Sequence, residues 1–103
     1  MPEHLSPARR VNSVAEITQP GDYFLNPHGD GNEAGRSLWF CLPIDIPGEM
    51  GWCHRITEPP WTFTEQPDGS VEVRASILTY EPPEHRVERW HGYLDAGNVW
   101  RRI

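Results

Sequence analysis

The sequence predicts one small, mainly β domain: a small antiparallel sheet or meander with an irregular N-terminal segment and at most one short helix. Three observations support this prediction. The chain has only 103 residues, which is the length of a single domain. Its eleven Pro and nine Gly interrupt it too often for long helices. Its C-terminal half consists of short apolar runs separated by turn residues, the pattern of successive strands.

The N-terminal third carries the weaker structural signals. Residues 1–12 are polar and are expected to form a disordered leader. Residues 13–37 are expected to be irregular, although Ser13 and Glu16 form a capping-box pattern that favours a helical turn or two. Residues 23–25 are expected to form at most a short strand within a loop rich in Gly, Asn, Asp and Pro.

Residues 38–103 make up the predicted β meander. Strands are expected at residues 37–42, 52–56, 61–65, 70–80, 87–94 and 99–103. The clearest is 70–80, where apolar residues from Val71 to Ile77 alternate with mainly polar ones at the period of two that a half-buried strand requires. The turn residues 66–69 precede it and end in Gly69, which can adopt positive φ without steric penalty.

Charge and hydropathy exclude several classes of partner. The net charge of -6 and the pI near 5.2 disfavour nucleic acids and anionic membranes, which both need a basic face. The longest apolar stretch, residues 38–43, is far shorter than the ~20 residues that span a bilayer. The N-terminus shows no signal-peptide pattern. These observations predict a cytoplasmic protein. The partner or substrate that we expect, from the candidate site described next, is a protein or peptide.

The loop at residues 81–86 is expected to close a hairpin. Counting outward from this loop assigns each residue of one flanking strand a partner on the other. If Tyr80 pairs with Val87, then Ile77 lies opposite Trp90 on the core face, an apolar cross-strand pair that stabilises a sheet. The same register places Ser76 opposite His91 on the polar face, with Cβ atoms about 5 Å apart.

A Ser hydroxyl beside an imidazole is the minimal unit of nucleophilic acyl transfer. We therefore predict Ser76 as nucleophile and His91 as general base and acid, with His54 or a nearby carboxylate orienting His91. Backbone amides near Ser76 would stabilise the oxyanion. The plainer interpretation remains open: Ser76 is a solvated strand serine, and the two histidines are ordinary sheet residues.

The last hairpin extends the polar face. With Leu94 opposite Val99, the count pairs Tyr93 with Trp100 and His91 with Arg102. The predicted substrate-binding residues on this face are Tyr93, Trp100, Arg74 and Arg102. The same aromatic face supports the alternative function, a noncatalytic accessory protein that binds a partner.

Zinc is a weaker alternative, and no cofactor is the leading expectation. Cys41, Cys53, His54 and His91 are suitable residue types, but their spacing lacks the paired short loops of zinc sites. In a reducing compartment two cysteines are more often free thiols.

Three segments also resemble a family of small phage and bacterial proteins. They are Leu38-Trp39-Phe40-Cys41, Gly51-Trp52-Cys53-His54-Arg55-Ile56 and Trp61-Thr62-Phe63, followed by Ser76, Trp90-His91 and Gly97. The family includes BubE of bacterial ubiquitin-like operons, described as a serine peptidase. The resemblance covers about two thirds of the chain, from Leu38 onward.

The resemblance implies Ser76 as nucleophile, His91 as base, His54 as a further family histidine, and the C-terminal tail of a ubiquitin-like protein as substrate. The sequence also departs from the family pattern. Ala75 replaces a Pro, Trp90 replaces a Cys, and a second Cys near Cys41 is missing, so the cysteines that zinc-binding members use are not all present here.

Overall fold

The computed structural model describes residues 4–28, 35–45, 53–80, 84 and 86–103, and within them the prediction of a mainly β fold is confirmed. The helical content is one 3-10 turn, Val14–Glu16, which begins after Ser13 where the capping-box pattern predicted it. The strands are β1 His4–Pro7, β2 Arg9–Arg10, β3 Asp22–Asn26, β4 Ser37–Phe40, β5 His54–Thr57, β6 Thr62–Glu65, β7 Val71–Arg74, β8 Ile77–Tyr80, β9 Glu88–Asp95 and β10 Val99–Arg102.

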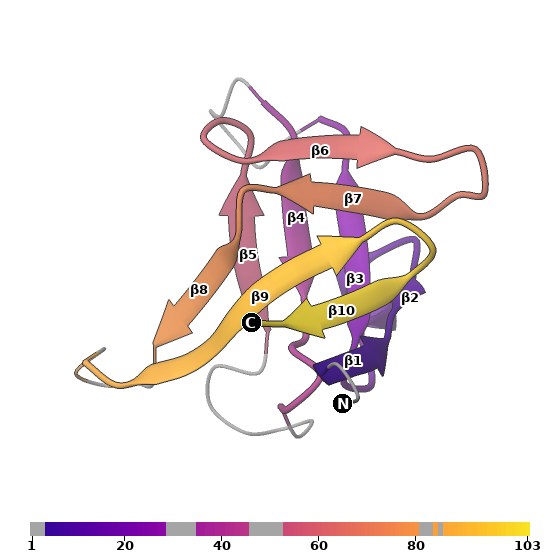
Figure 1. Ribbon diagram of the computed structural model, residues 1–103. Coiled ribbons are helices and arrows are strands. Elements are labelled where there is room, and N and C mark those ends of the chain that lie inside the picture. The colour runs from indigo at the N-terminus through magenta and orange to yellow at the C-terminus, as the bar shows by residue number, and fades with distance from the viewer. Residues whose placement is uncertain (1–3, 29–34, 46–52, 81–83, 85) are drawn as a thin grey trace.

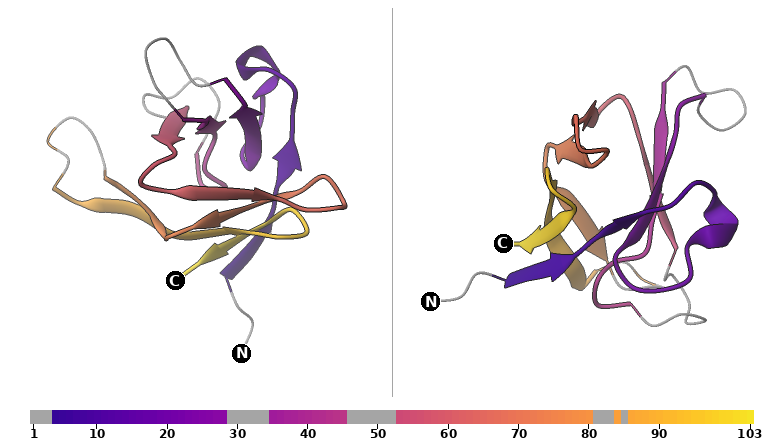
Figure 2. Two further views of the ribbon diagram at one scale, coloured as in Figure 1. Left: turned by 90° about the horizontal axis from the view of Figure 1, so that it is seen from above. Right: turned by 90° about the vertical axis from the view of Figure 1, so that its right-hand side faces the viewer.

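These strands form three small sheets rather than one meander. Their orders are β1-β10-β9-β8, β2-β3-β4-β5 and β6-β7. In Figure 1 the β9–β10 hairpin crosses in front of β3 and β4, and the β6–β7 hairpin lies across one end of both larger sheets. Figure 2 shows the same arrangement from two further sides, with the two larger sheets as separate layers. All strand pairs are antiparallel except the short pair β2–β3.

The expectation of a disordered leader is wrong for residues 4–10. β1 pairs antiparallel with β10, and β2 pairs parallel with β3. The turn at Gly21 accommodates this segment closely, because a Cβ on Gly21 would lie 2.5 Å from the carbonyl oxygen of Pro7. The first residues therefore belong to the sheets, and their polar composition reflects a strand that contributes few side chains to the core.

The larger of two apolar clusters among the described residues lies between the sheets. All three sheets contribute to it, and its fully or nearly fully buried side chains are Tyr23, Leu25, Leu38, Phe40, Leu42, Ile56, Phe63, Val71, Val73, Ile77, Trp90, Leu94 and Trp100. Its centre is aromatic: Trp90 and Trp100 pack edge to face with ring centroids 5.6 Å apart, and Phe40 lies 5.5 Å from Trp100.

The polar atoms of two buried aromatic residues connect the sheets. The Tyr23 hydroxyl accepts a 3.2 Å hydrogen bond from the Val71 amide and donates to the side chain of Asn98. The Trp100 indole N–H donates to the carbonyl of Gly21 at 2.9 Å. The polar atoms of Tyr23 and Trp100 thus both have partners, as burial requires.

The predicted strand 70–80 is in fact two strands. β7 pairs with β6, β8 pairs with β9, and the break falls at Ala75 and Ser76. The turn at Gly69 is as predicted, with φ of 88°. Alternation fails at the break, because Ala75, predicted as a core residue, is exposed.

Both predicted registers need correction. In the β8–β9 pair Leu78 lies opposite His91, and Tyr80 lies opposite Glu88 rather than Val87. In the β9–β10 pair Trp100 lies opposite Leu94, so Trp100 is buried in the core and does not share the polar face with Tyr93.

Arg102 likewise pairs with Gly92 and not with His91. It occupies an exposed position near the C-terminal end of β10. Within the described part of the chain, no helix has the length and apolar character needed to cross a membrane.

Candidate active site

Ser76 lies at the interruption between β7 and β8, where two flanking strands and one hydrogen bond determine its position. The β6–β7 ladder ends with Thr62 opposite Arg74 on one side of it. The buried side chain of Ile77 begins β8 on the other side. Between them, the indole N–H of Trp61 donates a 3.1 Å hydrogen bond to the Ser76 carbonyl. The backbone at Ser76 is therefore anchored even though it has left the regular ladder.

His91 lies on the outward-facing side of β9. Its neighbours along the strand, Trp90 and Gly92, are buried, so alternation directs His91 away from the core. Its carbonyl accepts a 2.9 Å hydrogen bond from the Ile103 amide. Gly92 is required here because a Cβ at that position would lie 2.2 Å from the Arg101 carbonyl oxygen.

Ser76 and His91 meet in the structure. The distance between Ser76 Oγ and His91 Nε2 is 3.1 Å, which is within hydrogen-bonding range. Their partnership is diagonal, since Leu78 and not Ser76 lies directly opposite His91. A neutral imidazole that accepts the hydroxyl proton at this distance has the geometry of a nucleophile and its general base.

A pocket adjoins Ser76. It has a volume of about 210 Å³ and is lined by Pro60, Trp61, Ala75 and Ser76. The nucleophile candidate therefore lies at the wall of a concavity and not on a flat sheet surface, which is the setting expected of a small-molecule or substrate site.

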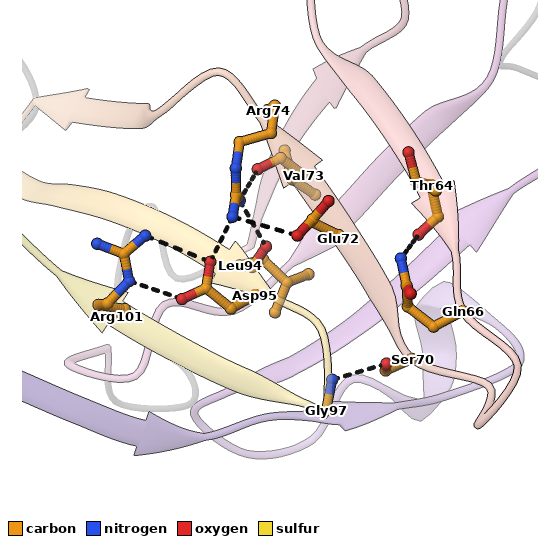
Figure 3. Close-up of polar contacts among 10 residues, drawn as sticks. All are labelled: Thr64, Gln66, Ser70, Glu72, Val73, Arg74, Leu94, Asp95, Gly97 and Arg101. Atoms are coloured by element: carbon orange, nitrogen blue, oxygen red, sulfur yellow. Dashed lines mark hydrogen bonds and ion pairs between the residues drawn. The ribbon is translucent and has the colours of Figure 1, made fainter.

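A cluster of charges supports the strand end that precedes Ser76 (Figure 3). The Arg74 guanidinium donates to Asp95 at 2.9 Å, and Arg101 donates to the same carboxylate at 2.7 Å. Both guanidinium groups also lie over the Tyr93 ring, 4.8 and 4.5 Å from its centroid. Burial raises the pKa of Asp95, but the two arginines outweigh it and the net shift is downward.

This cluster changes the role predicted for Tyr93 and Arg74. Both were expected to bind substrate on an aromatic wall that included Trp100. Trp100 is buried, and the Tyr93 ring is covered by the guanidinium groups of Arg74 and Arg101. The four residues predicted to bind substrate are therefore not one surface, and Arg74 and Tyr93 belong to a cluster of charged and aromatic side chains at the strand end that precedes Ser76.

The structure does not bring His54 to His91. His54 stacks on the buried ring of Phe40, and its Nε2 lies 2.8 Å from Asp45 Oδ2 on the core side of β5. Arg89 contributes a 2.8 Å hydrogen bond to the other oxygen of Asp45. His54 thus belongs to a buried ionic network, whereas His91 faces outward from β9.

Arg89 reaches Asp45 because the strand is irregular at that point. Thr79 pairs with Trp90 and Tyr80 pairs with Glu88, so Arg89 is an extra residue without a cross-strand partner. A bulge of this kind redirects a side chain. It turns Arg89 toward the carboxylate of Asp45 and away from the outward row that contains His91.

The zinc alternative finds no support in the described residues, among which no three His, Cys, Asp or Glu side chains gather around a possible metal position. Cys41 and Cys53 are free thiols. Burial, with the nearby carboxylates of Asp45 and Asp22, raises the pKa of Cys41 to about 12, so this thiol is held protonated.

No protein-family model, curated protein or solved structure matches this chain. The resemblance to BubE-like proteins therefore stays a prediction. Gly51 and Trp52, which carry part of it, lie outside the described residues.

Sequence reasoning missed Trp61 and Asp45. Trp61 precedes β6, and extending the β6–β7 register from the Thr62–Arg74 pair sets it opposite Ala75. That pairing was within reach of the sequence, because the turn at 66–69 was recognised. Asp45 follows a tight turn in which its amide bonds to the Leu42 carbonyl at 3.0 Å, and nothing local in the sequence distinguishes it from a surface loop residue.

Proposed function

We propose that the protein is a small serine hydrolase in which Ser76 attacks an acyl carbonyl and His91 acts as general base. The observation that carries this proposal is the 3.1 Å contact between the hydroxyl and the imidazole at the wall of a pocket. General bases contribute roughly 10²- to 10⁴-fold to such reactions.

The proposed reaction has two steps. Ser76 Oγ bonds to the carbonyl carbon as its proton passes to His91 Nε2, and the bond to the leaving group breaks as His91 returns that proton to it. Water then attacks the acyl-enzyme, giving a proton to His91, which returns it to Ser76 Oγ as the acid is released.

An extended peptide is the substrate class that this site suits best. Ser76 immediately precedes β8, which is the last strand of its sheet. An edge strand offers backbone groups to which an extended chain can add. The resemblance to BubE-like proteins makes the C-terminal tail of a ubiquitin-like protein the first peptide to try.

Labelling with a fluorophosphonate probe tests the proposal. We expect the wild-type protein to be labelled, Ser76→Ala to lose the label, and His91→Ala to label about 10²-fold or more slowly. Ser13→Ala is the matched control, since the Ser13 side chain makes no capping hydrogen bond. Absence of Ser76-dependent labelling would overturn the proposal.

A second candidate is a noncatalytic binding module that uses the β8–β9 hairpin. The observation in its favour is a group of exposed apolar side chains there: Leu78 is 39% exposed, Tyr80 43% and Val87 63%. For this function Tyr80→Ser would weaken binding of a partner while Ser76→Ala would leave it unchanged. A peptidase substrate should instead bind to Ser76→Ala and persist uncleaved.

A further inference from the structure

The pocket beside Ser76 has the size of one substituent. Its volume of about 210 Å³ is below the ~300–1,000 Å³ of clefts that enclose drug-sized ligands. One side chain or a short acyl chain therefore fits it, whereas a folded domain surface does not.

The pocket is chemically apolar. Pro60, Ala75 and the Trp61 ring supply carbon surface, and the one polar atom of the indole is already bonded to the Ser76 carbonyl. A charged group placed there would lose water without gaining a partner among these lining side chains, at a cost in free energy. An aliphatic group would instead gain about 0.8 kcal/mol per buried methylene.

The pocket and the nucleophile share residues and a hydrogen bond. Trp61 and Ala75 both line the pocket, and the Trp61 indole N–H donates to the carbonyl of Ser76 itself. Ser76 also forms part of the pocket lining. A group that occupies the pocket therefore lies next to Ser76, as the substituent on a carbonyl under attack must do.

We infer that this pocket binds the apolar acyl-side substituent of the substrate, with Trp61 and Ala75 as specificity-determining residues. The inference rests on the proposed hydrolase function and adds a substrate preference to it: an aliphatic side chain or short acyl chain next to the scissile carbonyl. Trp61 is also a positioning residue for Ser76, through its hydrogen bond.

Ester hydrolysis tests the preference. On p-nitrophenyl acetate and butyrate, the wild-type protein should favour the butyrate by about 15-fold in kcat/KM, since each added methylene corresponds to about 4-fold. Ala75→Val, a change at an exposed residue, should fill the pocket and remove that preference. Trp61→Phe should lower kcat on both esters, because it removes the hydrogen bond to the Ser76 carbonyl. An unchanged preference in Ala75→Val would overturn the inference.

A binding measurement separates this inference from the hydrolase proposal. In Ser76→Ala protein, titration with hexanamide should shift the Trp61 indole N–H resonance in NMR spectra, and Trp61→Phe assigns that resonance by removing it. A shift without Ser76-dependent hydrolysis would retain the apolar pocket and refute the hydrolase. Ser76-dependent hydrolysis without a shift would support the hydrolase proposal and refute the apolar pocket as its binding site.

Discussion

Replacing Asp45 with Asn is expected to destabilise the protein severely. Asp45 is fully buried and accepts hydrogen bonds from Arg89 on one oxygen and from His54 and the Leu42 amide on the other. The Arg89 side chain is only 15% exposed, and Asp45 is its ion-pair partner. The substitution would leave a guanidinium buried opposite a neutral amide whose NH₂ group also faces donors.

The magnitude follows from this burial. Breaking a buried ion pair by removing one partner costs about 3–5 kcal/mol. A domain of this size has a free energy of unfolding of about 5–15 kcal/mol, so the loss is a large fraction of the total. At about 4–8 °C per kcal/mol, even a loss of 3 kcal/mol lowers Tm by roughly 12–24 °C.

Urea unfolding followed by tryptophan fluorescence measures the effect in Asp45→Asn, Arg89→Met and the double variant Asp45→Leu/Arg89→Met. The double variant should recover much of the stability, because it buries no unpaired charge. A change below about 0.5 kcal/mol in Asp45→Asn would refute the reasoning. If folded Asp45→Asn protein loses Ser76 labelling, His54 has a catalytic role after all.

Two further predictions concern titratable groups. Burial raises the pKa of Asp22, but hydrogen bonds from Arg9 and two backbone amides give a net downward shift. The folded state therefore binds fewer protons than the unfolded state at acidic pH. The contribution of Asp22 to the free energy of unfolding is complete above the unfolded pKa of about 3.9, and it is lost as the pH falls through the lower pKa of the folded state. We expect Asp22→Asn to make the free energy of unfolding less dependent on pH in the acidic range. Because the pKa of Cys41 is raised to about 12, Cys41 should resist Ellman's reagent at pH 8 until urea unfolds the protein.

The meeting of Ser76 and His91 was predictable from sequence even though the assumed register was not correct. The count assumed Ser76 directly opposite His91, and the structure shifts the pairing so that Leu78 takes that place. Ser76 and Leu78 are two residues apart, and side chains two apart in a strand share a face. A register error of two residues therefore leaves Ser76 on the same face of the sheet as His91. It moves Ser76 from the position opposite His91 to a diagonal position, which is still within hydrogen-bonding distance.

The register predicted for the last hairpin was wrong by one residue, and this error moved a side chain to the other face of the sheet. Three residues connect Asp95 to Val99, with positive φ at both Gly97 and Asn98, where the sequence count assumed a four-residue connection. That single-residue difference turns Trp100 from the outer face into the core. Turn geometry, which sequence specifies poorly, thus decided whether an aromatic wall existed.

The N-terminal strands could not be predicted from the sequence for another reason. β1 and β2 are short and polar, and their partners β10 and β3 are selected by tertiary packing. Local propensity contains no information about such distant pairings.

The break between β7 and β8 connects the site to the fold. If 70–80 were one strand, Ala75 would face the core and the β6–β7 hairpin would extend the sheet of β8 and β9. Instead the chain changes sheets at Ala75, which places that residue in the pocket lining, lets the Ser76 carbonyl bond to Trp61 outside any ladder, and leaves the hydroxyl beside His91. The position where period-two alternation fails is thus the position where hydroxyl, imidazole and pocket converge, and a local departure from regular structure is what a functional site leads one to expect.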